Sequence, residues 1–121
     1  METKKSILIV DDEEGIRNLL CSVLSLGGYN VSTVSDGLAG LEELKAGDYD
    51  VVISDMKMPK ASGLDILAEV KKTGRKTKVI LISGYNTEEE ANIIKEAGAF
   101  SFLSKPFTLD EVNETVRKAL F

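Results

Sequence analysis

The sequence predicts an α/β fold: a doubly wound sheet of five parallel strands with five helices on both faces. Strand-like and helix-like segments alternate five times along the 121 residues, with short connections between them. Several strand-like segments are unbroken runs of Val, Ile and Leu, as in strands that are covered on both faces of a parallel sheet. Right-handed crossovers then carry the helices onto the two faces. We expect one domain over residues 1–121, because the chain is too short for two.

The expected elements follow one another in strict alternation. Strands are predicted over residues 6–10, 31–34, 51–54, 78–82 and 99–103. Helices are predicted over residues 13–26, 37–46, 64–72, 88–98 and 108–120.

The first helix has the clearest pattern and the second the weakest. Residues 13–26 place their apolar side chains on one helical stripe: Ile16, Leu19, Leu20, Val23 and Leu24. Gly27 and Gly28 are expected to end this helix. Residues 37–46 also carry leucines on one side, but Gly37 and Gly40 lower the helix propensity there.

The last two helices carry terminal signals. Three glutamates at residues 88–90 favour the positive end of a helix dipole, and Gly98 is expected to end that helix. Thr108 and Glu111 have the spacing of a capping box, which predicts a helix start at Thr108.

Composition excludes several functions. A formal net charge of -5 argues against binding to nucleic acid backbones or to anionic membrane surfaces. No apolar run approaches the roughly 20 residues of a membrane span. The chain has no His, which excludes His-based triads and His metal ligands, and its single Cys21 favours a reducing, cytoplasmic location.

Chemically active side chains stand where the predicted strands end. Asp11 and Asp12 follow the first strand, Asp55 follows the third, Ser83 follows the fourth and Lys105 follows the fifth. Because the carboxyl ends of parallel strands share one edge of the sheet, we expect these groups to converge there.

Three converging carboxylates repel one another unless a cation lies among them. Carboxylate oxygens and water suit a hard divalent ion, so the pattern predicts Mg²⁺, or Mn²⁺ in its place. With the ion bound, the site can receive a phosphoryl group, and Lys105 screens the charge that arrives. Asp55 can then attack phosphorus to give an aspartyl-phosphate, and Ser83 can donate a hydrogen bond to the phosphoryl group.

Each residue alone has a simpler interpretation. Asp11 or Asp12 could cap the first helix, Ser83 could belong to a turn, and Lys105 could be a solvated loop lysine. The functional interpretation rests on their joint register at the strand ends.

The segments that carry this pattern resemble a known family. They are residues 7–12, residues 55–59 with Gly63 beyond them, residues 83–84 and residues 105–107. In order and spacing they resemble the receiver domain of two-component response regulators, over essentially the whole chain. The parts from Ile7 to Leu20 and from Asp55 to Lys57 especially resemble the stand-alone receiver of the sporulation phosphorelay, whereas the part from Ser83 to Phe107 equally resembles receivers fused to transcription activators, so both arrangements stay open. The family's fold is flavodoxin-like, with strand order 2-1-3-4-5.

The resemblance implies a role for each site residue. Asp55 matches the phosphoacceptor. Asp11, Asp12 and the backbone carbonyl of Lys57 match the groups that hold the metal with it. Ser83 matches the switch hydroxyl, Lys105 the phosphoryl-binding lysine and Phe102 the switch aromatic. The Lys105–Pro106 bond is expected to be cis.

Some positions depart from the commonest family pattern. Ser83 stands where Thr is more frequent, and Phe102 stands where some members have Tyr. Lys57 and Tyr85 occupy positions that tune the phosphoryl lifetime in the family.

The implied function is a signalling switch and not an enzyme acting on other substrates. A sensor histidine kinase or a phosphotransfer protein would supply the phosphoryl group. The face formed by the fourth helix, fifth strand and fifth helix would report it to an effector domain or protein.

Three other functions compete with this one. A flavodoxin-like nucleotide-binding protein would need a phosphate-binding loop where the acids of residues 11–14 stand. A Mg²⁺-dependent aspartyl-phosphate phosphatase would need an acid at position 57, which is Lys. An interaction module that is never phosphorylated need not keep the acids and Lys105 together.

Overall fold

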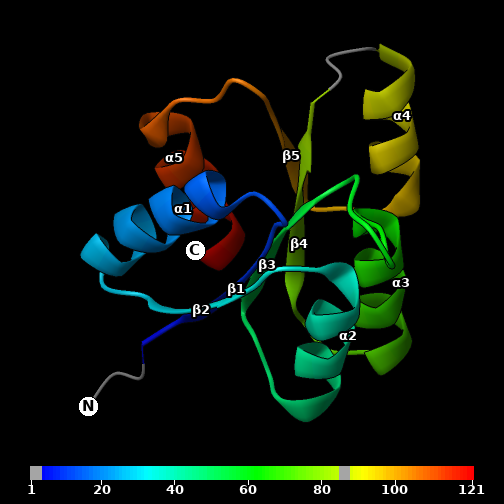
Figure 1. The fold of residues 1–121 in the computed structure, drawn as a ribbon, viewed down its shortest axis with the longest axis horizontal. Helices are drawn as coiled ribbons and strands as arrows, with labels where there is room; N and C mark the ends of the chain where they lie inside the picture. Colours follow the sequence, from blue (N-terminus) through cyan, green and yellow to red (C-terminus); the bar gives the residue numbers. More distant parts are fainter. Residues whose placement is uncertain (1–3, 85–87) are drawn as a thin grey trace.

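The computed structural model describes residues 4–84 and 88–121, and Figure 1 shows their fold. The strands are β1 (Ser6–Val10), β2 (Asn30–Val34), β3 (Val51–Asp55), β4 (Lys78–Ser83) and β5 (Ser101–Ser104). The helices are α1 (Glu14–Leu26), α2 (Gly37–Ala46), α3 (Gly63–Thr73), α4 (Glu88–Ala97) and α5 (Leu109–Leu120). The predicted alternation of strands and helices is confirmed.

The strands form one parallel sheet in the order β2-β1-β3-β4-β5. Helices α1 and α5 cover one face of this sheet, and α2, α3 and α4 cover the other (Figure 1). The predicted fold class and strand order are therefore confirmed. None of these helices, within the described part of the chain, is long and apolar enough to cross a bilayer.

The core has two layers, one on each face of the sheet. Ile7 and Ile9 of β1 pack with the buried side chains of α1 and α5. Leu8 and Val10, which alternate with them, pack with those of α2, α3 and α4. Every residue of β3 is buried, as expected for a central strand with helices on both sides.

The ends of the helices largely follow the predicted signals. The Thr108–Glu111 capping box is present, and Gly98 follows α4 with a φ of 90°. Strand β5 begins at Ser101, two residues later than the sequence suggested. The amide of Ala99 still bonds to the carbonyl of Ile94 and closes α4, and the first amide that bonds to β4 is that of Phe100, to the Val79 carbonyl at 2.8 Å.

Strand register brings distant parts of the chain to one edge. Val10 pairs with Ser54, so Asp11 and Asp55 follow at adjacent strand ends. Ser83, the last residue of β4, pairs with Ser104, which directly precedes Lys105. The chain reverses its direction of winding between β1 and β3, and crevices form at such points in doubly wound sheets.

Candidate metal and phosphoryl site

Three carboxylates meet at this edge. Asp11, Asp12 and Asp55 each offer an oxygen, and these atoms all lie within 4.8 Å of one another. Asp11 is fully buried, Asp55 is 6% exposed, and Asp12 is exposed. The predicted convergence of the three acids is confirmed.

Asp11 carries an oxygen that lacks a partner. Its Oδ1 accepts a hydrogen bond from the amide of Glu13 at 2.8 Å, and the Arg17 guanidinium binds its backbone carbonyl at 2.9 Å. Its Oδ2 is buried and accepts no hydrogen bond, the single case among side-chain atoms of the described residues. Burial, reinforced by the nearby charge of Asp55, raises the pKa of Asp11 to about 6, although the Glu13 amide opposes this.

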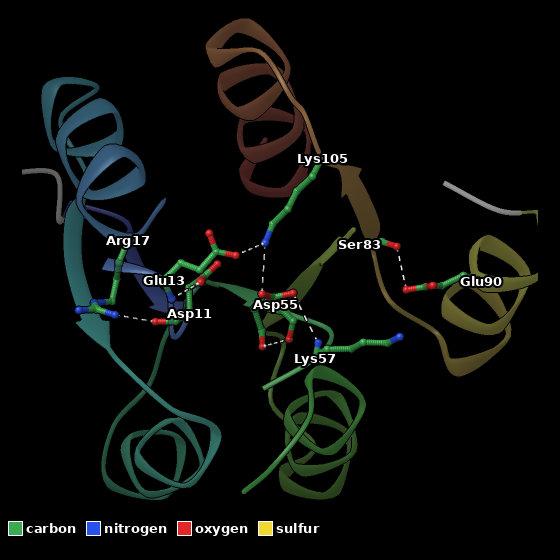
Figure 2. A network of polar contacts seen from close by, with 9 residues as sticks. Asp11, Glu13, Arg17, Asp55, Lys57, Ser83, Glu90 and Lys105 are labelled. Atoms are coloured by element: carbon green, nitrogen blue, oxygen red, sulfur yellow. Dashed lines mark hydrogen bonds and ion pairs between the residues drawn. The ribbon is translucent and has the colours of Figure 1, made fainter. Parts of the chain in front are cut away.

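Asp55 lies between a backbone amide and a cation. Its Oδ1 accepts from the amide of Lys57 at 3.4 Å, and its Oδ2 lies 3.4 Å from Lys105 Nζ (Figure 2). Burial is the largest influence and raises the pKa of Asp55, and the negative charge of Asp12 adds to the rise. Lys105 works in the opposite direction and limits the shift.

Lys105 is shared between two carboxylates. Its Nζ also lies 2.9 Å from Glu13 Oε1. Burial alone would lower the pKa of Lys105, but the hydrogen bond to Glu13 and the charges of Asp55 and Asp11 outweigh it and raise that pKa. The backbone amide of Lys105 bonds to the Ser83 carbonyl at 2.9 Å, and the Lys105–Pro106 peptide bond is cis, as the resemblance implied.

Ser83 does not face Asp55 in this structure. It is 1% exposed, and its hydroxyl donates to Glu90 Oε1 on α4 at 2.7 Å, on the side away from Asp55 (Figure 2). Phe102 lies on β5 and is 37% exposed. Tyr85 lies outside the described residues.

The alternative role of the acids as helix caps is not observed. The residue that caps α1 is Glu13, and its side chain makes no capping hydrogen bond. Asp11 bonds to the Glu13 amide two residues ahead, as in an Asx-turn, and keeps its second oxygen free of such bonds.

Three residues of the site were not singled out from the sequence. Glu13 binds Lys105, Arg17 binds the Asp11 carbonyl, and Glu90 binds Ser83. Glu13 could have been suspected from its place beside the acidic pair. Nothing in the run Glu88–Glu89–Glu90 indicates which of the three glutamates faces the sheet.

The donor set fits a hard divalent cation. All the candidate ligands are oxygens, and the unpartnered Asp11 Oδ2 is a buried acceptor that a metal ion, or water bound to it, would satisfy. With Glu13, which also pairs with Lys105, four carboxylates and one ammonium leave an excess of three negative charges, and a divalent ion would balance two of them.

Comparison with known proteins points to one family. The family model described as "Response regulator receiver domain" matches residues 7–117. Sporulation initiation phosphotransferase F of Bacillus subtilis is 36% identical over 116 residues, which are 96% of this chain and 94% of that protein. Regulatory protein AtoC of Escherichia coli is 37% identical over 114 residues, which are 94% of this chain but only 25% of AtoC.

A comparison with solved structures points to the same family. The response regulator protein TrrA of Thermotoga maritima, in complex with Mg²⁺-BeF, superposes with a TM-score of 0.85 at 38% identity, and the match covers 96% of this chain and 99% of that one. Phosphorylation-based signalling is the standard function of such proteins. Together with the acidic edge of the sheet, these matches show that the chain belongs to the receiver domain family of response regulators.

Proposed function

We propose that Asp55 accepts a phosphoryl group from a sensor histidine kinase or a phosphotransfer protein. The observation that carries the proposal is the position of Asp55, which is nearly buried, lies 3.4 Å from the Lys105 ammonium and shares one cluster of carboxylates with Asp11 and Asp12. A relative named as a phosphotransferase supports this class of partner. The role requires residues 1–121 to act as one receiver domain, which promotes only its own phosphorylation and dephosphorylation.

The metal site of this proposal consists of Asp11, Asp12, Asp55 and the backbone carbonyl of Lys57. Mg²⁺, or Mn²⁺ in its place, would neutralise charge on the carboxylates and on the phosphoryl oxygens when bound. The complex of TrrA with Mg²⁺-BeF supports this assignment, since that relative shares 38% of its residues with this chain.

The chain's own residues carry the transfer. An Asp55 carboxylate oxygen attacks phosphorus, a new P–O bond forms, and the P–N bond to the donor histidine breaks. The leaving nitrogen keeps the electron pair of that bond. Lys105 lies close enough to Asp55 to pair with one phosphoryl oxygen, and the Ser83 hydroxyl would donate to another after it turns away from Glu90.

The output face of the proposal consists of α4, β5 and α5. Ser83 stands at the end of β4, where its hydroxyl contacts α4 and its carbonyl contacts Lys105 after β5. Turning the hydroxyl toward Asp55 would change the contacts of both elements, and Phe102 on β5 would repack with them. A two-state shift of this kind lets the phosphoryl group act by binding one state better than the other. An effector domain or protein would read that state.

Intact-protein mass spectrometry tests the proposal. The protein is incubated with phosphoramidate, with Mg²⁺ or with chelator, beside the Asp55→Ala variant. We expect one added phosphoryl group in the wild-type protein with Mg²⁺, and none in the variant or in chelator. Labelling of Asp55→Ala at the wild-type level would refute the assignment of Asp55, and full labelling in chelator would refute the metal requirement.

A further inference from the structure

The hydroxyl of Ser83 is held by a glutamate. Ser83 Oγ donates to Glu90 Oε1 over 2.7 Å, and Figure 2 shows this bond directed away from Asp55. Ser83 is 1% exposed, whereas Glu90 lies partly buried in the first turn of α4. The bond therefore joins the end of a central strand to the helix beside it.

A serine hydroxyl has one proton to donate. A carboxylate is a strong acceptor for it, because hydrogen bonds to charged groups are shorter and stronger than those between neutral groups. A phosphoryl oxygen on Asp55 would need the same proton. The Glu90 carboxylate and the phosphoryl group therefore compete for Ser83.

We propose that Glu90 is a latch: it holds the Ser83 hydroxyl away from Asp55 as long as Asp55 carries no phosphoryl group. The inference rests on the proposed function of Asp55 and adds a positioning residue to it. When the phosphoryl group takes the hydroxyl, α4 loses this hydrogen bond to β4. The Glu90 carboxylate stays near the amino end of α4, where the helix dipole favours negative charge, so losing the hydrogen bond is only mildly unfavourable.

The latch lowers the affinity of the site for a phosphoryl group. Without the Glu90 carboxylate, the Ser83 hydroxyl can turn toward Asp55 without breaking a charge-assisted hydrogen bond. Glu90→Gln keeps the shape but weakens the acceptor, and Glu90→Ala removes it. Glu89→Gln is the matched control: it removes the same charge from the same helical turn, and Glu89 is exposed.

The probe is Mg²⁺-beryllofluoride, which stands for the phosphoryl group on Asp55, and amide NMR titration gives its dissociation constant. We expect binding to be about threefold tighter in Glu90→Gln and about fivefold tighter in Glu90→Ala, the scale of one partly exposed hydrogen bond. Glu89→Gln should bind like the wild-type protein. Equal tightening in Glu89→Gln and Glu90→Gln would show a general charge effect and overturn the latch.

A double-mutant cycle with Ser83→Ala separates the latch from a merely structural role. In the Ser83→Ala background, Glu90→Gln should leave beryllofluoride affinity unchanged, because the hydroxyl for which Glu90 and the phosphoryl mimic compete is gone. An undiminished gain in that background would overturn the proposal. Wild-type affinity in Glu90→Gln and Glu90→Ala would overturn the latch alone. A wild-type protein that binds no beryllofluoride would overturn the proposed function and the latch with it.

Discussion

The carboxylate of Glu13 lies 2.9 Å from the ammonium of Lys105 and joins the loop after β1 to the loop after β5. The same ammonium lies 3.4 Å from Asp55, so Glu13 competes with Asp55 for its cation. The Glu13 side chain is 58% exposed, and water therefore weakens the pair. Glu13 and Asp55 together position the Lys105 ammonium in the unliganded site.

The first prediction concerns Glu13→Gln. The change removes a negative charge beside the three aspartates of the proposed metal site. It also leaves Lys105 to pair with Asp55, which is one of the proposed metal ligands. Both effects should weaken Mg²⁺ binding, by about two- to fivefold, which is the scale of an exposed ion pair. Isothermal titration calorimetry at low salt measures it. Glu14→Gln, one residue further along α1, is the control, and an equal loss there would rule out a specific role for Glu13.

The second prediction concerns pH and Asp11 in metal-free buffer. The folded pKa of Asp11 is about 6 and its ordinary value is 3.8, so the folded protein holds this proton more firmly than the unfolded chain does. Stability should therefore rise as the pH falls from 6 toward 4, and the ionised carboxylate should be destabilising above pH 6. Asp11→Asn should add about 2 kcal/mol to the free energy of unfolding at pH 7.5.

Urea denaturation in chelator at several pH values tests this prediction. The advantage of Asp11→Asn should shrink as the pH approaches 4, where the wild-type carboxyl is protonated. Asp12→Asn should gain less, because Asp12 is exposed. A variant less stable than wild type at every pH would mean that the hydrogen bond from Glu13 to Asp11 outweighs the repulsion.

The third prediction is that Mg²⁺ stabilises the fold. An ion that binds only the folded state at ten times its dissociation constant should add about 1.4 kcal/mol to the free energy of unfolding. Thermal melts with MgCl₂, matched in ionic strength with NaCl, measure this gain. It should vanish in Asp11→Asn, whose side chain no longer offers the buried carboxylate. Equal stabilisation by NaCl would point to general screening of the acids.

The fourth prediction concerns the backbone behind Asp55. A Cβ on Gly63 would lie 2.6 Å from the Asp55 carbonyl oxygen and 2.9 Å from Leu81. Because backbone must shift to relieve this contact, Gly63→Ala should lower the free energy of unfolding by about 2 kcal/mol and weaken Mg²⁺ binding. Gly15→Ala in α1, where a Cβ meets nothing within 4 Å, should instead be neutral or stabilising by about 0.5 kcal/mol. Chemical denaturation compares the two, and similar losses would contradict the steric argument.

The fifth prediction concerns the output face. Adding Mg²⁺-beryllofluoride should shift amide resonances in α4 and β5 as well as in the loops after β1 and β3, and Ser83→Ala should reduce the distant shifts. Phe102 lacks a phenol hydroxyl, so packing alone should govern its position. Two-dimensional NMR provides the comparison. Shifts confined to the loops after β1 and β3 would mean that ligand binding does not switch this face.

Much of the fold follows from local patterns. Strands β1, β3 and β4 contain short apolar runs that stop at polar residues. The Thr108–Glu111 capping box and Gly98 place helix ends without any tertiary information. The position of Asp11, Asp12 and Asp55 at one edge followed from strand direction, because parallel strands put their carboxyl ends together, and the pairing of β1 with β3 brings them into contact range.

Two features that depend on tertiary packing could not be predicted in this way: the contact of Glu90 with Ser83 and the start of β5. Glu90 reaches Ser83 because α4 packs at a particular rotation against β4, and three consecutive glutamates carry no signal for that rotation. The start of β5 depended on where the chain leaves α4, since the Ala99 amide still bonds to the Ile94 carbonyl and the Phe100 amide is the first to bond to β4. Both outcomes are set by packing and not by propensity.

The order of strands in the sheet has a consequence for protein synthesis. Asp11 emerges from the ribosome early, but Asp55 must pair beside it, and Lys105 arrives only with the end of β5. A nascent chain therefore lacks the complete proposed site until Lys105 has been translated. Fragments that end before Lys105 would lack the cation beside Asp55 and, under the proposed function, should accept a phosphoryl group poorly.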